Sequence, residues 1–286
     1  GEEEEEVEVG GGDGEGAKKK KKDDGTPEEE ERAHLDEVIA RTCNSGGKMY
    51  RAFVTVSTAD RLRSYSPPTP ADEEEAYTLA WRAEVFQAFL LIEDDIMDGS
   101  EQRRGAAAWW KVVGMPRALN DGLTLHVLSH RLASRGARAD VRERVRQLLD
   151  RVAYLTALGQ NADASLEKMP VDEYDMGAYS RMAKLKTAYY SFYEPVAVGI
   201  LLARRPDEAS LLRGARDVAM RMGEYYQRKD DFKDCFDERG KKGMDISDGK
   251  CTWLIVEAMR LGDEGQRETL RANYGRGGGA EGGADE

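Results

Sequence analysis

Two clusters of aspartates, each at the end of an apolar helical segment, restrict this chain more than any other feature. Both clusters read Asp-Asp-x-x-Asp, and they begin at Asp94 and Asp230. Residues four apart share one face of a helix, so Asp94 with Asp98, and Asp230 with Asp234, project their carboxylates side by side. Like charges at this spacing cost about 0.2–0.5 kcal/mol, and acids near a helix C-terminus cost roughly 0.3–1 kcal/mol each. The repeated arrangement therefore predicts bound cations.

The ligand type points to one class of metal. Carboxylate oxygens with no His or Cys nearby favour Mg²⁺, which keeps several waters and links a few carboxylates to the phosphates of a substrate. The alternative is that these are solvated or helix-capping aspartates. That explanation suits a single cluster but not two clusters on apolar helices.

Basic residues at several points of the chain are suited to phosphate binding. Arg103 and Arg104 are adjacent on a short turn, and adjacent guanidinium groups can fork toward two phosphate groups. Paired glycines precede Lys48 and Arg51, which lie one helical turn apart, although a loop-to-helix junction explains that segment equally well. Further lysines follow at Lys186, Lys241 and Lys250. Together with apolar and aromatic helices, these residues favour a diphosphate substrate with an apolar tail.

The body of the chain is predicted to be helical. Between Trp81 and Ile96 the apolar residues recur every three or four positions, which is typical of a mostly buried helix. Pro67, Pro68 and Pro70 predict a loop between two helices. Similar helical patterns run through 141–163, 174–203, 208–235 and 251–262.

Charge and composition exclude several classes of protein. Of the formal net charge of −12 over 286 residues, −8 lies in residues 1–32 and −3 in 281–286, so the body is almost neutral. A basic nucleic-acid-binding domain is therefore not expected. Three cysteines exclude a disulfide scaffold, and no apolar run is long enough to span a membrane.

Composition also predicts the division of the chain. We expect residues 1–33 to be a disordered low-complexity tail, 34–275 a catalytic domain and 276–286 a flexible, Gly-rich acidic tail. The N-terminal segment lacks the apolar stretch of a signal peptide and the acid-poor composition of a transit peptide, so we expect a cytoplasmic protein.

At this point the sequence resembles the trans-isoprenyl diphosphate synthase family, and most closely the eukaryotic farnesyl diphosphate synthases. The segments that carry the resemblance occur in the family's order. They are GGKMYR at 46–51, EVFQAFLLIEDDIMDGSEQRRG at 84–105, GQNAD at 159–163, KLKTAYYSFYEPVA at 184–197, MGEYYQRKDDFKDCF at 222–236 and GMDISDGKCTWL at 243–254.

The resemblance implies an all-α helical bundle around a central cavity, shortened at both ends relative to the family, and a homodimer. It implies that isopentenyl diphosphate is condensed with dimethylallyl or geranyl diphosphate, through an allylic carbocation, to give farnesyl diphosphate. Mg²⁺, as three ions, would neutralise the charge that develops on the leaving diphosphate.

The resemblance also implies a role for individual residues. The metal would be held by Asp94, Asp98 and Asp230, with support from Asp95, Asp163, Asp231 and Asp234. The allylic diphosphate would be bound by Arg103, Lys186 and Lys241, with Gln160 lining its site, and isopentenyl diphosphate by Gly47, Lys48, Arg51, Gln87 and Arg104. Lys250 would be a further substrate-binding residue, close to the metals. Catalytic groups beside the reacting carbons would be Lys186, Thr187, Tyr190 and Gln227. Product length would be set by Phe89 and Leu90.

Some positions differ from the family's usual residues. Lys229 and Lys233 lie one helical turn apart at the second cluster, where an ammonium group pointing inward would pair with Asp230 or displace a metal ion. The sequence leaves their orientation open. Glu93 precedes the first cluster, and a solvated neighbour is favoured over an additional acid in the metal's surroundings.

Two other functions stay open on the sequence alone. One is a terpene synthase, which would cyclise a single substrate, although cyclases usually replace the second aspartate cluster. The other is a catalytically weak regulatory subunit that pairs with a prenyl synthase. The complete set of aspartates with Arg103 and Lys186 favours an enzyme over such a subunit.

Overall fold

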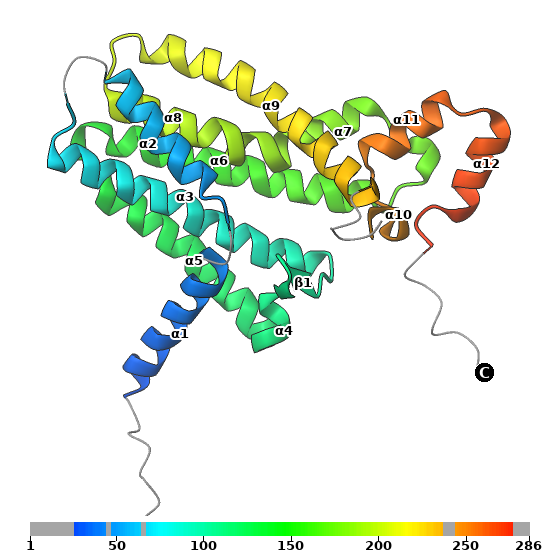
Figure 1. Ribbon diagram of the computed structural model, residues 1–286, viewed down its shortest axis with the longest axis horizontal. Helices are drawn as coiled ribbons and strands as arrows, with labels where there is room; N and C mark the ends of the chain where they lie inside the picture. The colour runs from blue at the N-terminus through cyan, green and yellow to red at the C-terminus, as the bar shows by residue number, and fades with distance from the viewer. Residues whose placement is uncertain (1–25, 44–46, 64–66, 237–243, 277–286) are drawn as a thin grey trace, which may run out of the picture.

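The computed structural model describes residues 26–43, 47–63, 67–236 and 244–276. The described part of the chain is a bundle of helices with one two-stranded hairpin, which confirms the predicted all-α fold. In Figure 1 the longer helices run side by side along the long axis, and α10, α11 and α12 gather at one end.

The elements follow one another with short connections. In chain order they are α1 (Pro27–Cys43), α2 (Tyr50–Leu62), α3 (Pro70–Met97), β1 (Gln102–Arg103), β2 (Ala106–Ala107), α4 (Trp109–Val113), α5 (Met115–Gly136), α6 (Ala139–Leu166), the 3₁₀ helix η1 (Val171–Glu173), α7 (Met176–Ala183), the π-helix η2 (Lys184–Tyr193), α8 (Glu194–Ala203), α9 (Glu208–Phe236), α10 (Met244–Asp248), α11 (Trp253–Leu261) and α12 (Glu264–Asn273). The helical patterns of the sequence correspond to α3, α6, the run α7–η2–α8, α9 and α11.

Helix α3 places the first aspartate cluster. It begins with a capping box in which the Thr69 side chain accepts from the backbone N–H of Asp72, while the Asp72 carboxylate accepts from the N–H of Thr69. Pro70 is therefore the first residue of the helix rather than part of the preceding loop, a position that suits its fixed φ. Helix α3 ends at Met97, and Asp98 forms its C-cap.

Three apolar clusters hold the bundle together. One joins α3, α6 and α8, and it includes Leu79, Val145 and Leu202. A second joins α1, α3, α4 and α5, and the third joins α7 to α11. Since burial of apolar area stabilises by roughly 25 cal/mol per Å², these clusters fix the long helices that carry the polar side chains described below.

The first helix corrects one expected boundary. Helix α1 starts at Pro27, inside the segment 1–33 that the sequence predicts to be a disordered tail. Its first turn contains three glutamates, which interact favourably with the helix dipole. His34 Nε2 lies 2.9 Å from Asp121 Oδ1 on α5, and Trp109 Nε1 donates to the other carboxylate oxygen at 2.8 Å. Residues 1–25 and 277–286 of the two predicted tails lie outside the described residues.

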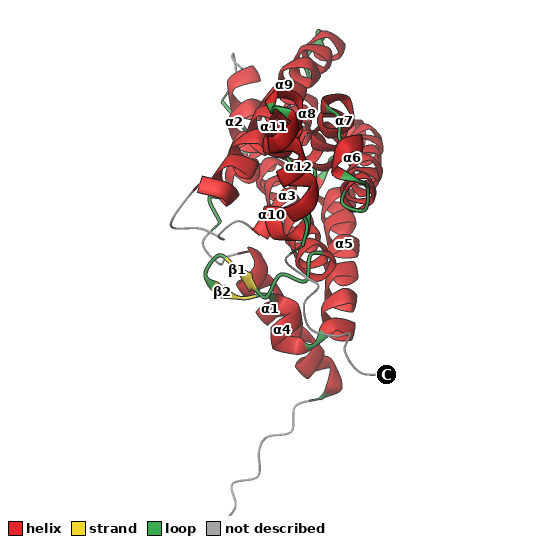
Figure 2. Cartoon of the chain, turned by 90° about the vertical axis from the view of Figure 1, so that its right-hand side faces the viewer, coloured by secondary structure: helices red, strands yellow, loops and turns green. Residues whose placement is uncertain are grey.

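The hairpin β1–β2 lies at the end of α3. Gln102 pairs with Ala107, and Arg103 with Ala106, in antiparallel register. Figure 2 shows the hairpin below the main bundle, beside α4. Among the described helices, none combines the length and the apolar character that a membrane span needs.

Candidate active site

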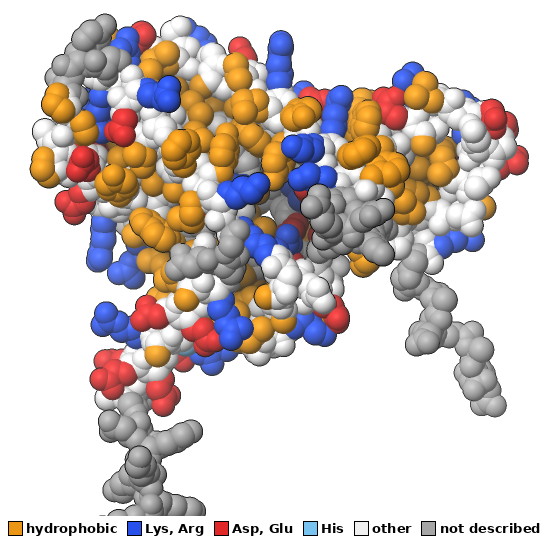
Figure 3. Space-filling view, viewed as in Figure 1, with side chains coloured by type: hydrophobic (Ala, Val, Ile, Leu, Met, Phe, Trp, Pro, Cys, Tyr) orange, Lys and Arg blue, Asp and Glu red, His pale blue; other side chains and the backbone are white. Residues whose placement is uncertain are grey.

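A polar cavity of about 530 Å³ lies between α3, α6, η2 and α9. Figure 3 shows a hollow near the middle of one face, rimmed by Lys and Arg side chains with acidic side chains inside. Both aspartate clusters open into this cavity, the first from the end of α3 and the second from α9. The two clusters are therefore brought together although more than 130 residues separate them.

Asp94 is surrounded by donors from three other elements. Lys186 Nζ lies 3.2 Å from its Oδ1, Gln160 Nε2 donates to the same oxygen at 3.2 Å, and Arg103 Nη2 donates to Oδ2 at 3.1 Å. Burial by itself would raise the pKa of Asp94, but the charges of Lys186 and Arg103 outweigh burial and lower the pKa to about 2. Asp94 is thus held as a carboxylate.

Lys186 joins the first cluster to α6. Its ammonium donates to Asp163 Oδ2 at 2.6 Å in addition to its contact with Asp94. Burial opposes the charged form, but the neighbouring carboxylates of Asp94 and Asp163 raise the pKa of Lys186 above its ordinary value. Lys186 is therefore a permanent cation at the centre of the cavity.

Arg103 is positioned by the hairpin. The strand pairing of β1 directs its guanidinium back to α3, where Nε donates to Asp95 Oδ1 at 2.9 Å. Asp95 is buried, and Arg103 contacts both members of the Asp94–Asp95 pair. The buried Asp95 therefore orients Arg103 from outside the cavity, while Asp94 lines the cavity.

The second cluster also has one buried member that is hydrogen-bonded to protein groups. Asp231 is buried and accepts hydrogen bonds from the Tyr179 hydroxyl at 2.7 Å, the Trp253 backbone N–H at 2.8 Å and Gln227 Nε2 at 3.1 Å. These donors make Asp231 the residue that fixes α9 against α7 and α11.

Asp230 and Asp234 have fewer hydrogen-bond donors around them than Asp231 has. Within the described residues, Asp230 has no hydrogen bond or ion pair. Its side chain is exposed to the open cavity, and its pKa is raised by partial desolvation there and by the charges of Asp234 and Asp94. Burial together with Asp234 and Asp231 also raises the pKa of the neighbouring Asp245 to about 7. This part of the cavity thus carries more negative charge than its surroundings neutralise.

Several uncharged polar groups lie beside the charged ones. The Thr187 hydroxyl donates to Gln227 Oε1 at 2.7 Å, which fixes the orientation of the amide whose other end binds Asp231. Arg51 reaches from α2 over the ring of Tyr190, 4.6 Å from the ring centre, and its Nη2 donates to Ser191 Oγ at 2.5 Å.

Two glycines allow the helices around the cavity to approach closely. A Cβ atom at Gly159 of α6 would lie 2.2 Å from the backbone nitrogen of Lys186. A Cβ atom at Gly223 of α9 would lie 2.3 Å from the Cβ of Ala188. Both contacts are on η2, so α6 and α9 meet the π-helix backbone to backbone.

Most of the residues expected from the sequence line this one cavity. They are Arg51, Gln87, Leu90, Asp94, Asp98, Arg103, Arg104, Gln160, Asp163, Lys186, Thr187, Tyr190, Gln227, Asp230, Asp231, Asp234 and Lys250.

Five expected residues are placed otherwise. Gly47 does not line the cavity but lies against Arg104, whose Nη1 would be 2.9 Å from a Cβ at that position. Lys48 is exposed and lies outside the lining, and Asp95 is the buried partner of Arg103. Phe89 points to α5, where its ring centre is 4.8 Å from that of His126. Lys241 lies outside the described residues.

The sequence reasoning missed other lining residues. They are Leu91, Thr156, Met182, Tyr226, Asp245, Cys251 and Thr252. Asp245 lies in a segment that the family resemblance includes, so its charge was the available signal. Leu91, Tyr226, Cys251 and Thr252 also lie in such segments, whereas Thr156 and Met182 carry no pattern that separates them from ordinary core residues.

The donor set of the cavity fits a metal–diphosphate ligand. Polar atoms of Arg51, Gln87, Thr156 and Gln160 are buried at the cavity without a hydrogen-bond partner among the described residues, which is costly unless a polar ligand satisfies them. Among the described residues, no three His, Cys, Asp or Glu side chains form a preformed metal site. In the first cluster, the carboxylates of Asp94 and Asp98 form ion pairs with basic side chains.

Comparison with known proteins agrees with this geometry. The polyprenyl synthetase family model matches residues 32–285. The chain belongs to this family. It is 37% identical over 241 residues to the farnesyl pyrophosphate synthase of Saccharomyces cerevisiae, covering 81% of this chain and 68% of the yeast protein. It is 36% identical to the farnesyl pyrophosphate synthase of Gallus gallus, covering 88% of this chain and 71% of the relative.

Solved structures give the same family. The farnesyl diphosphate synthase of T. brucei complexed with risedronate matches with a TM-score of 0.79 and 32% identity, over 90% of this chain and 76% of that one. Members of the polyprenyl synthetase family that resemble this chain generally use Mg²⁺, which suits the oxygen ligands of the cavity.

This chain differs from the family's usual pattern at positions that the structure places. Lys233 lines the cavity, and its charge lowers the pKa of Asp230 against the stronger effect of burial, whereas Lys229 is exposed outside the lining. Glu93 also lies outside the cavity lining. It is half-buried against α5, where its Oε1 would lie 2.8 Å from a Cβ at Gly122, and burial raises its pKa.

Proposed function

We propose that this chain condenses isopentenyl diphosphate with dimethylallyl or geranyl diphosphate to give farnesyl diphosphate. One observation carries the proposal. Both aspartate clusters, the basic side chains and the unpartnered buried polar atoms share a single cavity, and the apolar residues Leu90, Leu91 and Met182 also line it. A charged head group with an apolar tail fits that combination, and the relatives' names agree with it.

The metal would be held by Asp94, Asp98 and Asp230, with Asp234 beside them, and we infer that three Mg²⁺ ions are bound together with the substrate diphosphate. Mg²⁺ supplies neutralising charge for the leaving diphosphate. Asp231, Asp95 and Asp163 are already hydrogen-bonded to protein donors, so we assign them the task of positioning Tyr179, Arg103 and Lys186.

Two sets of basic residues would separate the two diphosphates. Arg103, Lys186 and Lys250 contact the first aspartate cluster, so they suit the allylic diphosphate. Arg51, Gln87 and Arg104 line the cavity toward α2, and Gly47 leaves space beside Arg104, so they suit isopentenyl diphosphate.

The uncharged groups would act at the reacting carbons. When the allylic C–O bond breaks, positive charge develops on the substrate, and oxygen dipoles fixed in place stabilise it. Thr187 and Gln227 hold each other by a hydrogen bond, and Tyr190 lies under Arg51. The apolar lining excludes water, which would otherwise capture the cation.

The test is an elongation assay on the full chain with Mg²⁺, isopentenyl diphosphate and geranyl diphosphate. We expect a 15-carbon product, and we expect Asp94→Ala to lower its rate by about 10²–10³-fold, the size of losing one electrostatic contact to the transition state. A cyclic product from geranyl diphosphate alone would instead indicate a terpene synthase. A folded protein without turnover would contradict the proposal and favour the regulatory subunit.

The length of the product gives a second prediction. Leu90 lines the cavity while Phe89 packs on His126, so we expect Leu90→Ala to deepen the cavity and raise the 20-carbon share of the products. Phe89→Ala is the matched control, and it should leave product length unchanged while lowering stability. Chromatographic separation of the products checks this. A longer product from Phe89→Ala but not from Leu90→Ala would contradict the assignment.

We further propose that two copies associate through the outer face of α5. Met115, Leu119, Leu123 and Val127 recur every fourth residue on that helix, and each is more than two-fifths exposed. An exposed apolar row of this kind is typical of a protein–protein interface.

The cytoplasmic location expected from the sequence stays a prediction.

A further inference from the structure

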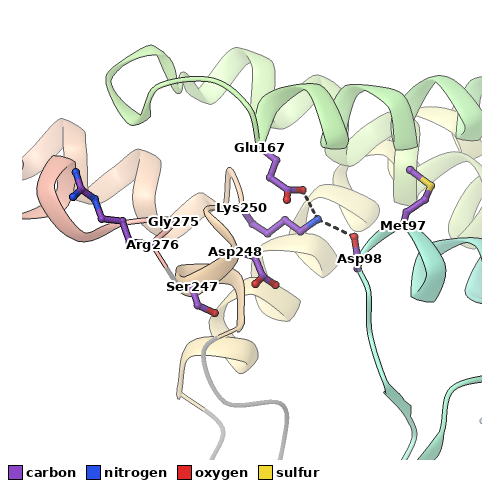
Figure 4. A pocket seen from close by; sticks show the side chains of 8 residues that line it. All are labelled: Met97, Asp98, Glu167, Ser247, Asp248, Lys250, Gly275 and Arg276. Atoms are coloured by element: carbon purple, nitrogen blue, oxygen red, sulfur yellow. Dashed lines mark hydrogen bonds and ion pairs between the residues drawn. The ribbon is translucent and has the colours of Figure 1, made fainter. Parts of the chain in front are cut away.

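The ammonium group of Lys250 lies between two carboxylates that belong to different helices. Its Nζ donates to Asp98 Oδ1 at the end of α3 at 2.9 Å and to Glu167 Oε2 just after α6 at 2.8 Å. Figure 4 shows the lysine between them, with both contacts drawn. Among the residues that the structure describes, these are the two hydrogen-bonded partners of this ammonium group.

The backbone that carries Lys250 is fixed on both sides. The Tyr174 hydroxyl donates to the carbonyl of Gly249 at 2.7 Å, and the Tyr274 hydroxyl donates to the carbonyl of Lys250 at 2.7 Å. Gly249 has a φ of 72°, and a Cβ there would lie 3.0 Å from the Cα of Gly275. Because this backbone is held in place, the Lys250 ammonium group can shift only by rotation of its side chain toward Asp98 or toward Glu167.

The two partners of Lys250 differ in position. Asp98 lines the cavity together with the other aspartates and also borders a second, adjoining hollow of about 700 Å³, whereas Glu167 borders only that second hollow. The Glu167 side chain is 35% exposed and that of Lys250 is 14% exposed. Glu167 can therefore hold the ammonium group without itself entering the metal's surroundings.

The proposed function sets these two partners in competition. An ammonium group paired with Asp98 competes with Mg²⁺ for the same carboxylate, because both are cations that need its oxygens. A second carboxylate outside the cavity shares the lysine and weakens that competition. Burial disfavours the charge of Lys250, but Asp163, Asp98 and Glu167 outweigh burial and raise its pKa, so the lysine stays charged throughout.

We propose that Glu167 is a positioning residue that retains the Lys250 ammonium group at the edge of the cavity and so leaves Asp98 available to Mg²⁺. The proposal rests on the proposed function, because it presupposes that Asp98 binds the metal. Nothing in the two aspartate motifs points to Glu167, which lies outside both.

The test measures metal binding without turnover. The full chain is unfolded by heat at a fixed, saturating concentration of inorganic pyrophosphate while Mg²⁺ is varied, and the Mg²⁺ concentration that gives half of the total rise in Tm is recorded. We expect Glu167→Gln to raise this concentration by about three- to tenfold, the size expected for one partly exposed charge-assisted hydrogen bond. The solution is the same for every variant, so complex formation between Mg²⁺ and pyrophosphate does not affect the comparison.

Two further variants separate positioning from a general charge effect. Glu173→Gln removes the same charge from an exposed side chain nearby in sequence, and it should leave the Mg²⁺ dependence unchanged. In a Lys250→Met background, Glu167→Gln should have no further effect. A shift that persists without Lys250, or one that Glu173→Gln reproduces, would overturn the proposal.

The outcomes also distinguish this proposal from the proposed function. If the unsubstituted chain elongates substrates but Glu167→Gln leaves its Mg²⁺ dependence unchanged, the proposed function stands and the role of Glu167 is wrong. If the unsubstituted chain shows neither turnover nor any rise of Tm with Mg²⁺, both are wrong.

Discussion

Replacing Glu194 by Gln should lower the free energy of unfolding by about 3–5 kcal/mol, one of the largest effects of any single substitution in this chain. Glu194 begins α8 and forms an ion pair with Arg82 of α3, and the two side chains are only 2% and 1% exposed. Burial lowers the pKa of Arg82 and raises that of Glu194, so each charge is maintained against burial mainly by the other. Removing one leaves the other buried without a counter-charge.

The matched variants test this explanation rather than the general sensitivity of the core. Arg82→Met combined with Glu194→Leu replaces both charges by apolar side chains and should recover most of the lost stability. Glu143→Gln removes one half of an exposed ion pair with Arg146 and should leave the free energy of unfolding almost unchanged. Unfolding in urea gives these free energies, and a double variant as unstable as Glu194→Gln alone would contradict the prediction.

The second large effect is expected at Gly223, where α9 meets η2. A methyl group there would lie 2.3 Å from the Cβ and 2.4 Å from the Cα of Ala188, and backbone atoms cannot move aside as the end of a flexible side chain can. We expect Gly223→Ala to cost about 1–3 kcal/mol, the usual range for overpacking, or more. Because α9 carries Asp230 and Asp231, its displacement should also lower the elongation rate well beyond the loss of folded protein.

The same helix supplies the control. Gly214 of α9 has nothing within 4 Å of the position that a Cβ would occupy. Gly214→Ala should therefore be neutral or stabilise by up to about 1 kcal/mol, since Ala is the better helix former. Thermal unfolding and elongation rates of the two variants check this pair, and equal losses in both would show that close packing at Gly223 is not the cause.

Much of the site could be predicted from the sequence because its chemistry is local. The aspartates at i and i+4, the adjacent arginines and the lysine within an aromatic helix are each visible in a few neighbouring residues, and the family resemblance gives their order. The structure brings the two clusters into one cavity.

The remainder depends on contacts between distant segments. Nothing in the apolar stretch around Arg82 indicates that its partner is Glu194, which lies 112 positions further along the chain. Phe89 and Leu90 are neighbours on α3, so helix periodicity turns them by about 100° and sends one to α5 and the other to the cavity. Which of the two faces inward depends on where α5 packs, and short-range patterns do not contain that information.

The π-helix η2 has a consequence for how this chain can vary. In η2 the hydrogen bonds span five residues instead of four, as in the bond from the Glu194 N–H to the Tyr189 carbonyl, and such wide turns are uncommon outside functional sites. Loss of one residue between 184 and 193 would let the segment close as an ordinary α-helix. It would also change which side chains of this segment share a face with Lys186. In this stretch the number of residues is therefore as constrained as their identity, and a deletion should be tolerated far less readily than most substitutions.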